Sequence, residues 1–219
     1  MTMKTYLKLI ILFLCTLSVS CKEYDTTYPE GYVGSSKITQ YPVLTLNGDR
    51  YVALVNGGTF TDPGATAKAG DQDVPVTVTG SVDSSTPGVY TLTYSAVNTD
   101  GFSASVNRTV VIATVDASAE NNDLSGSYAR STNGSVAVWT KLAPGVYTVF
   151  NPGGAPGTNL TVVVVNATGY EIEIPEQAAS DGSPTSSSDE VYNPSSPATY
   201  TWRILNPGYG TGLRTFTKQ

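Results

Sequence analysis

The stretch PGVYTLTYSA, residues 87–96, decides the fold class of this chain. After a turn-forming Pro-Gly pair, Tyr90, Leu92, Tyr94 and Ala96 occupy every second position, and small hydroxylated residues fill the positions between them. A period of two is typical of a β-strand with one buried face and one face toward water. The stretch therefore predicts a half-buried strand that begins at a proline-glycine turn.

The same pattern continues on both sides of this strand. Further strands are expected at residues 43–49, 51–55, 74–78 and 104–112, separated by turn sequences rich in Asn, Gly and Asp. Pro75 cannot donate a backbone hydrogen bond, so the strand at 74–78 is expected at a sheet edge. Thr99–Gly101 is expected to form a hairpin turn. No long helical period occurs after residue 20, and the prediction is an all-β protein with almost no helix.

Four motifs in a fixed order carry a family resemblance. They are LTLNG at 44–48, FTDPGA at 60–65, PGVYTLTY at 87–94 and RTVV at 108–111. Together they resemble the bacterial immunoglobulin-like domains of Bacteroidota surface lipoproteins, which are related to hyalin-type repeats. The resemblance covers residues 41–113 and implies a seven-stranded Greek-key sandwich. In such a sandwich Tyr90 can hydrogen-bond back across its own turn, as a tyrosine corner does.

The remaining chain is expected to hold a second β-domain. Residues 114–124 are polar and acidic and are interpreted as an interdomain linker. Residues 125–219 are predicted to form an antiparallel β-sandwich or open barrel, with strands at 126–130, 136–142, 146–150, 160–165, 170–174, 198–205 and 213–217. The stretch 177–197, rich in Ser, Asp and Pro, is predicted to be a long loop that is either functional or mobile.

The N-terminus reads as an export signal. Lys4 and Lys8 precede the apolar run 9–14, and small and polar residues follow before Cys21. This order is that of a secretory signal peptide, and the apolar run is too short to span a bilayer. The segment before Cys21 resembles the lipobox of bacterial lipoproteins, although Ser18 stands where Leu is usual. We expect a signal peptide at 1–20 and lipid on Cys21. The alternative is ordinary cleavage that leaves a free thiol at Cys21.

The residues after Cys21 bear on location. The sequence CKEYD at 21–25 looks like the charged tag that sends lipoproteins of Bacteroidota to the outer face of the outer membrane. Asp25-Thr26-Thr27 is similar to an O-glycosylation motif of the same phylum, with Thr26 as the acceptor, and a plain polar linker is the alternative. We therefore expect a lipid-anchored protein of the outer membrane and cell surface, with residues 21–40 as a flexible tether.

Composition excludes several functions. The chain has no histidine, so a Ser-His-Asp or Cys-His arrangement is impossible. Cleavage at residue 20 removes two of the 12 basic residues and leaves 10 against 18 acids, a net charge of −8. Such a charge repels nucleic acid. With Cys15 removed and Cys21 acylated, no disulfide can form.

No catalytic or metal site is expected. Glu171, Glu173 and Glu176 are the clustered glutamates after the first domain, and a glycosidase needs a pair of carboxylates. Because Glu171 and Glu173 alternate with isoleucines, we interpret them as the solvated face of a strand. The acids at 71–73, at 181 and at 189–190 could offer oxygen ligands to Ca²⁺, but their spacing does not match an EF-hand. We expect no cofactor, no metal and no enzymatic activity.

Binding is the remaining hypothesis. A carbohydrate site needs exposed aromatic rings beside polar loops, and Trp139, Trp202, Tyr192 and Tyr209 lie near loop sequences. Trp202 shares a strand face with Ile204, which favours a core position, whereas the parity of Trp139 is not informative.

The C-terminal half also resembles uncharacterised domains of Bacteroidota lipoproteins encoded near glycan-import systems of the starch-utilisation type. The segments DLSGSY at 123–128, IPEQ at 174–177 and NPGYG at 206–210 carry this likeness. It implies a glycan-binding accessory protein of a polysaccharide uptake complex. The alternative is a structural or adhesive envelope protein that uses its immunoglobulin-like domain as a spacer and binds protein.

Overall fold

The computed structural model describes residues 27–219, so the predicted signal peptide, Cys21 and Thr26 lie outside the described residues. The chain divides into two units, residues 1–40 and 41–219. In the first unit, the described part of the predicted tether forms a small antiparallel hairpin of β1 (Tyr32–Val33) and β2 (Ser36–Lys37).

The second unit begins with the predicted immunoglobulin-like sandwich. Its described residues form seven strands: β3 (Pro42–Leu46), β4 (Tyr51–Val55), β5 (Ala65–Ala69), β6 (Gln72–Asp73), β7 (Val76–Thr79), β8 (Gly88–Val97) and β9 (Ser103–Ala113). They make a three-stranded sheet, β3-β5-β6, and a four-stranded sheet, β4-β9-β8-β7. The predicted fold class is confirmed, and β7, which follows Pro75, is an edge strand as expected. Strand β4 pairs parallel with β9, which the sequence did not indicate.

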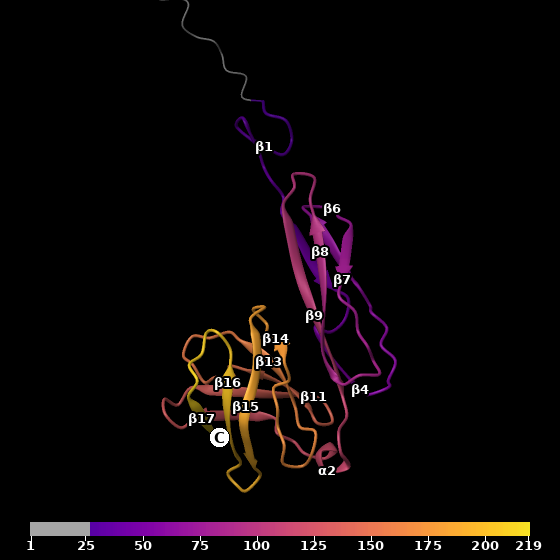
Figure 1. Cartoon of the computed structure of the whole chain (residues 1–219). Coiled ribbons are helices and arrows are strands. Elements are labelled where there is room, and N and C mark those ends of the chain that lie inside the picture. The colour runs from indigo at the N-terminus through magenta and orange to yellow at the C-terminus, as the bar shows by residue number, and fades with distance from the viewer. Residues whose placement is uncertain (1–26) are drawn as a thin grey trace, which may run out of the picture. The chain divides into compact units, whose positions relative to one another are not determined.

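The long strands β8 and β9 lie side by side and carry the centre of this sandwich (Figure 1). Leu92, Tyr94 and Ala96 are buried on β8, as the period of two predicts. The hydroxyl of Tyr90 donates to the carbonyl of Thr86 at 2.8 Å, which confirms the expected tyrosine corner. Tyr90 and Tyr94 therefore both contribute to the structure of the sandwich.

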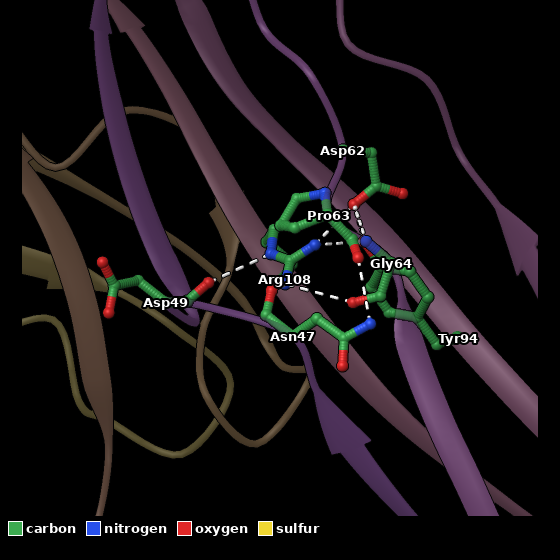
Figure 2. A network of polar contacts seen from close by, with 7 residues as sticks. All are labelled: Asn47, Asp49, Asp62, Pro63, Gly64, Tyr94 and Arg108. Carbon is green, nitrogen blue, oxygen red and sulfur yellow. Dashed lines mark hydrogen bonds and ion pairs between the residues drawn. The ribbon is translucent and has the colours of Figure 1, made fainter.

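A buried arginine joins the two sheets (Figure 2). The Arg108 guanidinium is fully buried and donates to the carbonyls of Asp49 at 3.0 Å and Asn47 at 2.6 Å. It also pairs with the Asp62 carboxylate at 2.5 Å, and the Tyr94 hydroxyl donates to the same carboxylate oxygen. Partial burial acts to raise the pKa of Asp62, but the hydrogen bonds from Tyr94 and from the backbone N–H of Gly64, together with Arg108, lower it on balance. All four sequence motifs contribute to this network, through Asn47, through Asp62 and Gly64, through Tyr94 and through Arg108.

The predicted interdomain linker is ordered. Residues 117–120 form the helix α2 (Ala117–Glu120), whose first turn is capped because the Asp116 carboxylate accepts from the N–H of Ser118. Ala119 and Leu124 are buried, and the N–H of Asp116 donates to the carbonyl of Ala167 at 2.8 Å. Leu124 belongs to the core of the following domain and anchors the segment against it.

The second domain is a nearly closed antiparallel barrel of eight strands within the described residues. These are β10 (Gly126–Arg130), β11 (Val136–Ala143), β12 (Val146–Phe150), β13 (Thr161–Val165), β14 (Gln177–Ala178), β15 (Pro184–Asn193), β16 (Thr199–Leu205) and β17 (Leu213–Lys218). Their order is β13-β12-β11-β10-β17-β16-β15-β14. Two predictions were wrong. Residues 170–174 contribute only a bridge between Glu173 and Val165, and the expected loop at 177–197 contains β14 and the ten-residue strand β15.

The side chain of Gln177 links the two terminal strands of the barrel, β13 and β14, by hydrogen bonds. The buried amide of Gln177 accepts from the N–H of Val163 at 2.7 Å and donates to the carbonyl of the same residue at 2.8 Å. Nearby, the N–H of Ser180 donates to the carbonyl of Thr161. The Gln177 amide thus forms the hydrogen bonds to Val163 that a neighbouring strand would otherwise make. Without it, the N–H and the carbonyl of Val163 would be buried without partners.

The sandwich and the barrel share an apolar cluster. Val111 and Ala113 at the end of β9 pack with Val146 and Val163 of the barrel. Val115 of the linker packs against the same cluster, and residues 41–219 form one compact unit.

Candidate functional site

The two tryptophans lie in the core of the barrel and offer no surface for a ligand. Trp139 and Trp202 are 2% and 0% exposed, and their rings stack with centroids 5.7 Å apart. The indole N–H of Trp202 donates to the carbonyl of Pro152 at 3.0 Å. The prediction that these rings bind sugar is wrong, because both ring faces are covered by neighbouring side chains of the core; the parity argument for Trp202 is confirmed.

Tyr192 and Tyr209 are half-buried and pack against the same core. The Tyr209 hydroxyl lies 3.2 Å from Oγ1 of Thr158, and the Arg214 guanidinium lies 5.2 Å from the ring centroid. Gly153 approaches the ring so closely that a Cβ there would lie 2.4 Å from a ring carbon. Tyr209 therefore joins two loops. It borders an open hollow of about 350 Å³ with Asp181 and Asn206. The Asp181 carboxylate accepts from Ser183 in its own turn, and the Asn206 amide donates to the hydroxyls of Ser183 and Thr185.

Tyr170 is the most exposed aromatic residue of the barrel. It is 70% exposed, which makes it the most exposed aromatic side chain of residues 27–219. Tyr170 lies on the rim of an open hollow of about 470 Å³. The hollow is lined by the loop after β13 and by the middle of β15: Val165, Ala167, Tyr170, Glu171, Ile172, Glu173, Ser187, Ser188, Asp189 and Glu190. We call it the Tyr170 hollow.

Buried side chains hold the loop that forms one side of the Tyr170 hollow. Ile172 and Ile174 are buried in the barrel core, so Glu171 and Glu173 point outward between them. The side-chain amide of the fully buried Asn166 donates to the carbonyls of Thr168 and Glu171, which holds the turn that carries Tyr170. The ring and the two carboxylates are therefore presented by a held loop, and the predicted exposure of Glu171 and Glu173 is confirmed.

The strand side is formed by a β-bulge. The register of β15 against β16 shifts between Ser188 and Val191, and Asp189 has a positive φ of 56°. The Asp189 carboxylate accepts from Nε of Arg203 at 2.8 Å, and this hydrogen bond lowers the pKa of Asp189. The hydroxyl of Ser187 donates to the carboxylate of Glu190. The bulge thus places the side chains of Asp189 and Glu190 on the lining of the hollow.

The Tyr170 hollow combines a ring face with many hydrogen-bond acceptors. Four carboxylates and two serine hydroxyls line it, and none of the described lining residues is a lysine or an arginine. Carboxylates accept hydrogen bonds from hydroxyl and amide groups, and the face of a tyrosine packs against apolar surface. The arrangement can hold a neutral, hydroxyl-rich ligand with one apolar face.

A metal site is not evident in the part of the chain that the structure describes. Within residues 27–219 no group of three or more acidic, histidine or cysteine side chains could hold a metal ion. Of the acids considered for Ca²⁺, Asp181 accepts from Ser183, Asp189 pairs with Arg203, and Asp73 pairs loosely with Lys68. The same described residues contain no helix long and apolar enough to cross a membrane.

Comparisons with known proteins identify the first domain. Residues 44–112 match the sequence model of a family described as bacterial surface protein, Ig-like domain. No curated protein matches the chain. The first domain is therefore an immunoglobulin-like domain similar to those of bacterial surface proteins, in agreement with the resemblance seen in its motifs.

Solved structures give distant similarities. A lipoprotein of Bacteroides thetaiotaomicron is 23% identical, with a TM-score of 0.42, over 82% of this chain and 100% of that one. A fragment of Clostridium perfringens ZmpB with an M60 catalytic domain and two CBM51 domains is 15% identical over 83% of this chain and 21% of the fragment, with a TM-score of 0.31. A second ZmpB fragment, with CBM51-2 in complex with GlcNAc, is 14% identical over 80% and 43%, with a TM-score of 0.30.

Proposed function

We propose that this protein is a non-catalytic, lipid-anchored protein of the bacterial cell surface that binds glycans at the Tyr170 hollow. In this proposal it serves an outer-membrane glycan uptake complex as an accessory protein. The immunoglobulin-like domain carries the barrel away from the lipid on Cys21.

The observation that carries the proposal is the exposed ring of Tyr170 beside outward-facing carboxylates. A sugar ring has an apolar face of C–H groups and an edge of hydroxyls. When the apolar face stacks on Tyr170, the hydroxyl edge lies within reach of Glu171, Glu173 and Asp189, which accept hydrogen bonds. Large aromatic side chains that stay exposed and are held by their surroundings are common in binding surfaces.

Location is supported by the N-terminal sequence and by the family of the first domain. The segment before Cys21 resembles a lipobox, and residues 44–112 match a domain of bacterial surface proteins. The charged residues after Cys21 favour the outer face of the outer membrane. Stable anchoring by two or three acyl chains is expected for such a modification.

Glycan binding can be tested with a matched pair of tyrosine variants. The soluble mature chain is screened on an array of neutral and acidic polysaccharides and oligosaccharides, and affinity for each hit is measured by calorimetry. Tyr170→Ala should weaken binding about tenfold or more, because the stacking face is lost. Tyr41→Ala removes another exposed tyrosine, 60% exposed in the first domain, and should leave affinity unchanged. Absence of binding to every glycan, or equal effects of the two variants, would refute the proposal.

A second candidate function is protein binding, and one observation favours it. Val138 and Phe150 are paired across β11 and β12 and are 39% and 41% exposed, so apolar side chains lie together on the outside of the barrel. Exposed apolar pairs of this kind often lie in contacts with other proteins. Replacing both with Ser should abolish capture of a partner by cross-linking on intact cells if this function holds, and should leave capture unchanged if it does not.

A further inference from the structure

A second hollow adjoins the Tyr170 hollow at the junction of the two domains. It has a volume of about 290 Å³, and Val165, Ala167 and Glu173 line both hollows. The other lining residues are Pro87, Gly88, Val111, Ile112, Ala113, Thr114 and Pro175. We call it the junction pocket. Half of its lining residues belong to the immunoglobulin-like domain, so that domain reaches the candidate binding site.

The junction pocket differs in chemistry from the Tyr170 hollow. Its side chains are apolar apart from Thr114 and Glu173, whereas the Tyr170 hollow is lined by four carboxylates. A sugar hydroxyl placed against the apolar part of the lining, away from Thr114 and Glu173, would lose water without gaining a partner, which is unfavourable. A small apolar group would gain by leaving water. Glu173 lies on the lining of both hollows, so its carboxylate can accept a hydrogen bond from a donor between them.

The pocket is formed by parts of the structure that hold each other in place. Its floor belongs to the paired strands β8 and β9, where Gly88 lies opposite Ile112. The barrel side is tied to the first domain by the apolar cluster around Val111 and Val163 and by the hydrogen bond from Asp116 to Ala167. A preformed pocket binds a ligand without a large loss of conformational entropy.

We propose that the junction pocket takes the acyl group of an N-acetylated sugar whose ring stacks on Tyr170. This proposal rests on the glycan-binding function proposed above and specifies the class of glycan. The acetyl methyl enters the apolar pocket, and the amide N–H donates to Glu173 at its entrance. An ester-linked acetyl group has no such donor, so the arrangement favours an acetamido group. The immunoglobulin-like domain then forms part of the binding site.

The test compares two neutral β-1,4-linked tetrasaccharides that differ at C2. Chitotetraose carries an acetamido group there, and cellotetraose carries a hydroxyl. The mature chain should bind chitotetraose at least about tenfold more tightly, the usual effect of one apolar group in a fitting pocket. Equal affinity for the two sugars would overturn the proposal, even if both bind.

Two matched threonine variants locate the effect. Thr114 is exposed and lines the pocket, so Thr114→Phe should fill it and reduce the affinity for chitotetraose to that for cellotetraose. Thr79→Phe, at an exposed position of the edge strand β7, should leave the preference intact. Melting temperatures close to wild type confirm that both variants fold. A preference that survives in Thr114→Phe would also overturn the proposal.

The outcome separates this inference from the function on which it rests. If the chain binds no glycan on the array, the proposed function fails and this inference fails with it. If the chain binds other glycans in a Tyr170-dependent manner but shows no preference for acetamido sugars, the inference alone is overturned.

Discussion

Replacement of Gln177 by Leu should destabilise the barrel by about 3 kcal/mol. The side chain is 7% exposed, and its amide satisfies both the N–H and the carbonyl of Val163, a residue with no exposed surface. Leucine has a similar volume but no polar atoms, so both backbone groups would stay buried without a partner. Each such group costs about 1–3 kcal/mol, and the added apolar contact offsets part of that cost.

Tryptophan fluorescence makes this a specific assay. The chain has two tryptophans, Trp139 and Trp202, and both lie in the core of the barrel, so urea unfolding followed by fluorescence reports on this domain. Gln72→Leu is the matched control, because Gln72 is exposed on β6. Its unfolding midpoint should stay close to wild type. If Gln177→Leu changes the unfolding free energy by less than about 0.5 kcal/mol, a value usual for surface substitutions, the amide does not close the barrel.

Three further predictions concern other parts of the chain. The pKa of Asp62 is lowered in the folded protein, so the ionised carboxylate stabilises the fold fully at pH values above its ordinary pKa of 3.8, and this stabilisation is lost as the pH falls below that value. Thermal unfolding measured across this pH range should show the loss. Asp62→Asn should reduce the pH dependence of stability and lower stability at pH 7. Gly153→Ala should destabilise the barrel by about 1–3 kcal/mol in urea unfolding, because a Cβ would overlap the ring of Tyr209, whereas Gly210→Ala, with no heavy atom within 4 Å, should not. Cys21→Ser should move the protein from the membrane to the soluble fraction, and retention in the membrane would contradict lipid anchoring.

Strand positions could be predicted where burial on one face imposes a period of two. Strands β8, β11 and β16 begin and end within two residues of the predicted positions, because part or all of each strand alternates between buried and less buried residues. Strand β15 was missed because most of its residues are polar, with little apolar content. Its structure comes from backbone pairing with β16, and pairing partners leave no mark in a single sequence.

The buried network around Arg108 shows a different limit. The motifs that contain Asn47, Asp62 and Arg108 could be recognised as a set, but nothing in their local sequences indicates that they meet. The three residues are brought together only when the two sheets pack, and the sequence separation between Asp62 and Arg108 is 46 residues. Arg108, the one charged residue in the predicted strand 104–112, was the available signal, since a buried charge needs a partner.

The sequence did not point to Tyr170 because the strand predicted at residues 170–174 would have placed its side chain on the buried face. If residues 170–174 were a strand, Tyr170 would share the buried face of Ile172 and Ile174, and the sequence offered no reason to consider it a binding residue. In the structure residues 168–170 form a bend and turn, and the buried amide of Asn166 holds that turn through the carbonyls of Thr168 and Glu171. Because Tyr170 belongs to this turn, its side chain does not follow the alternation of buried isoleucines and exposed glutamates in residues 171–174. Loss of the Asn166 amide, which leaves the ring itself unchanged, should therefore weaken glycan binding as much as loss of Tyr170, because the position of the ring depends on that turn.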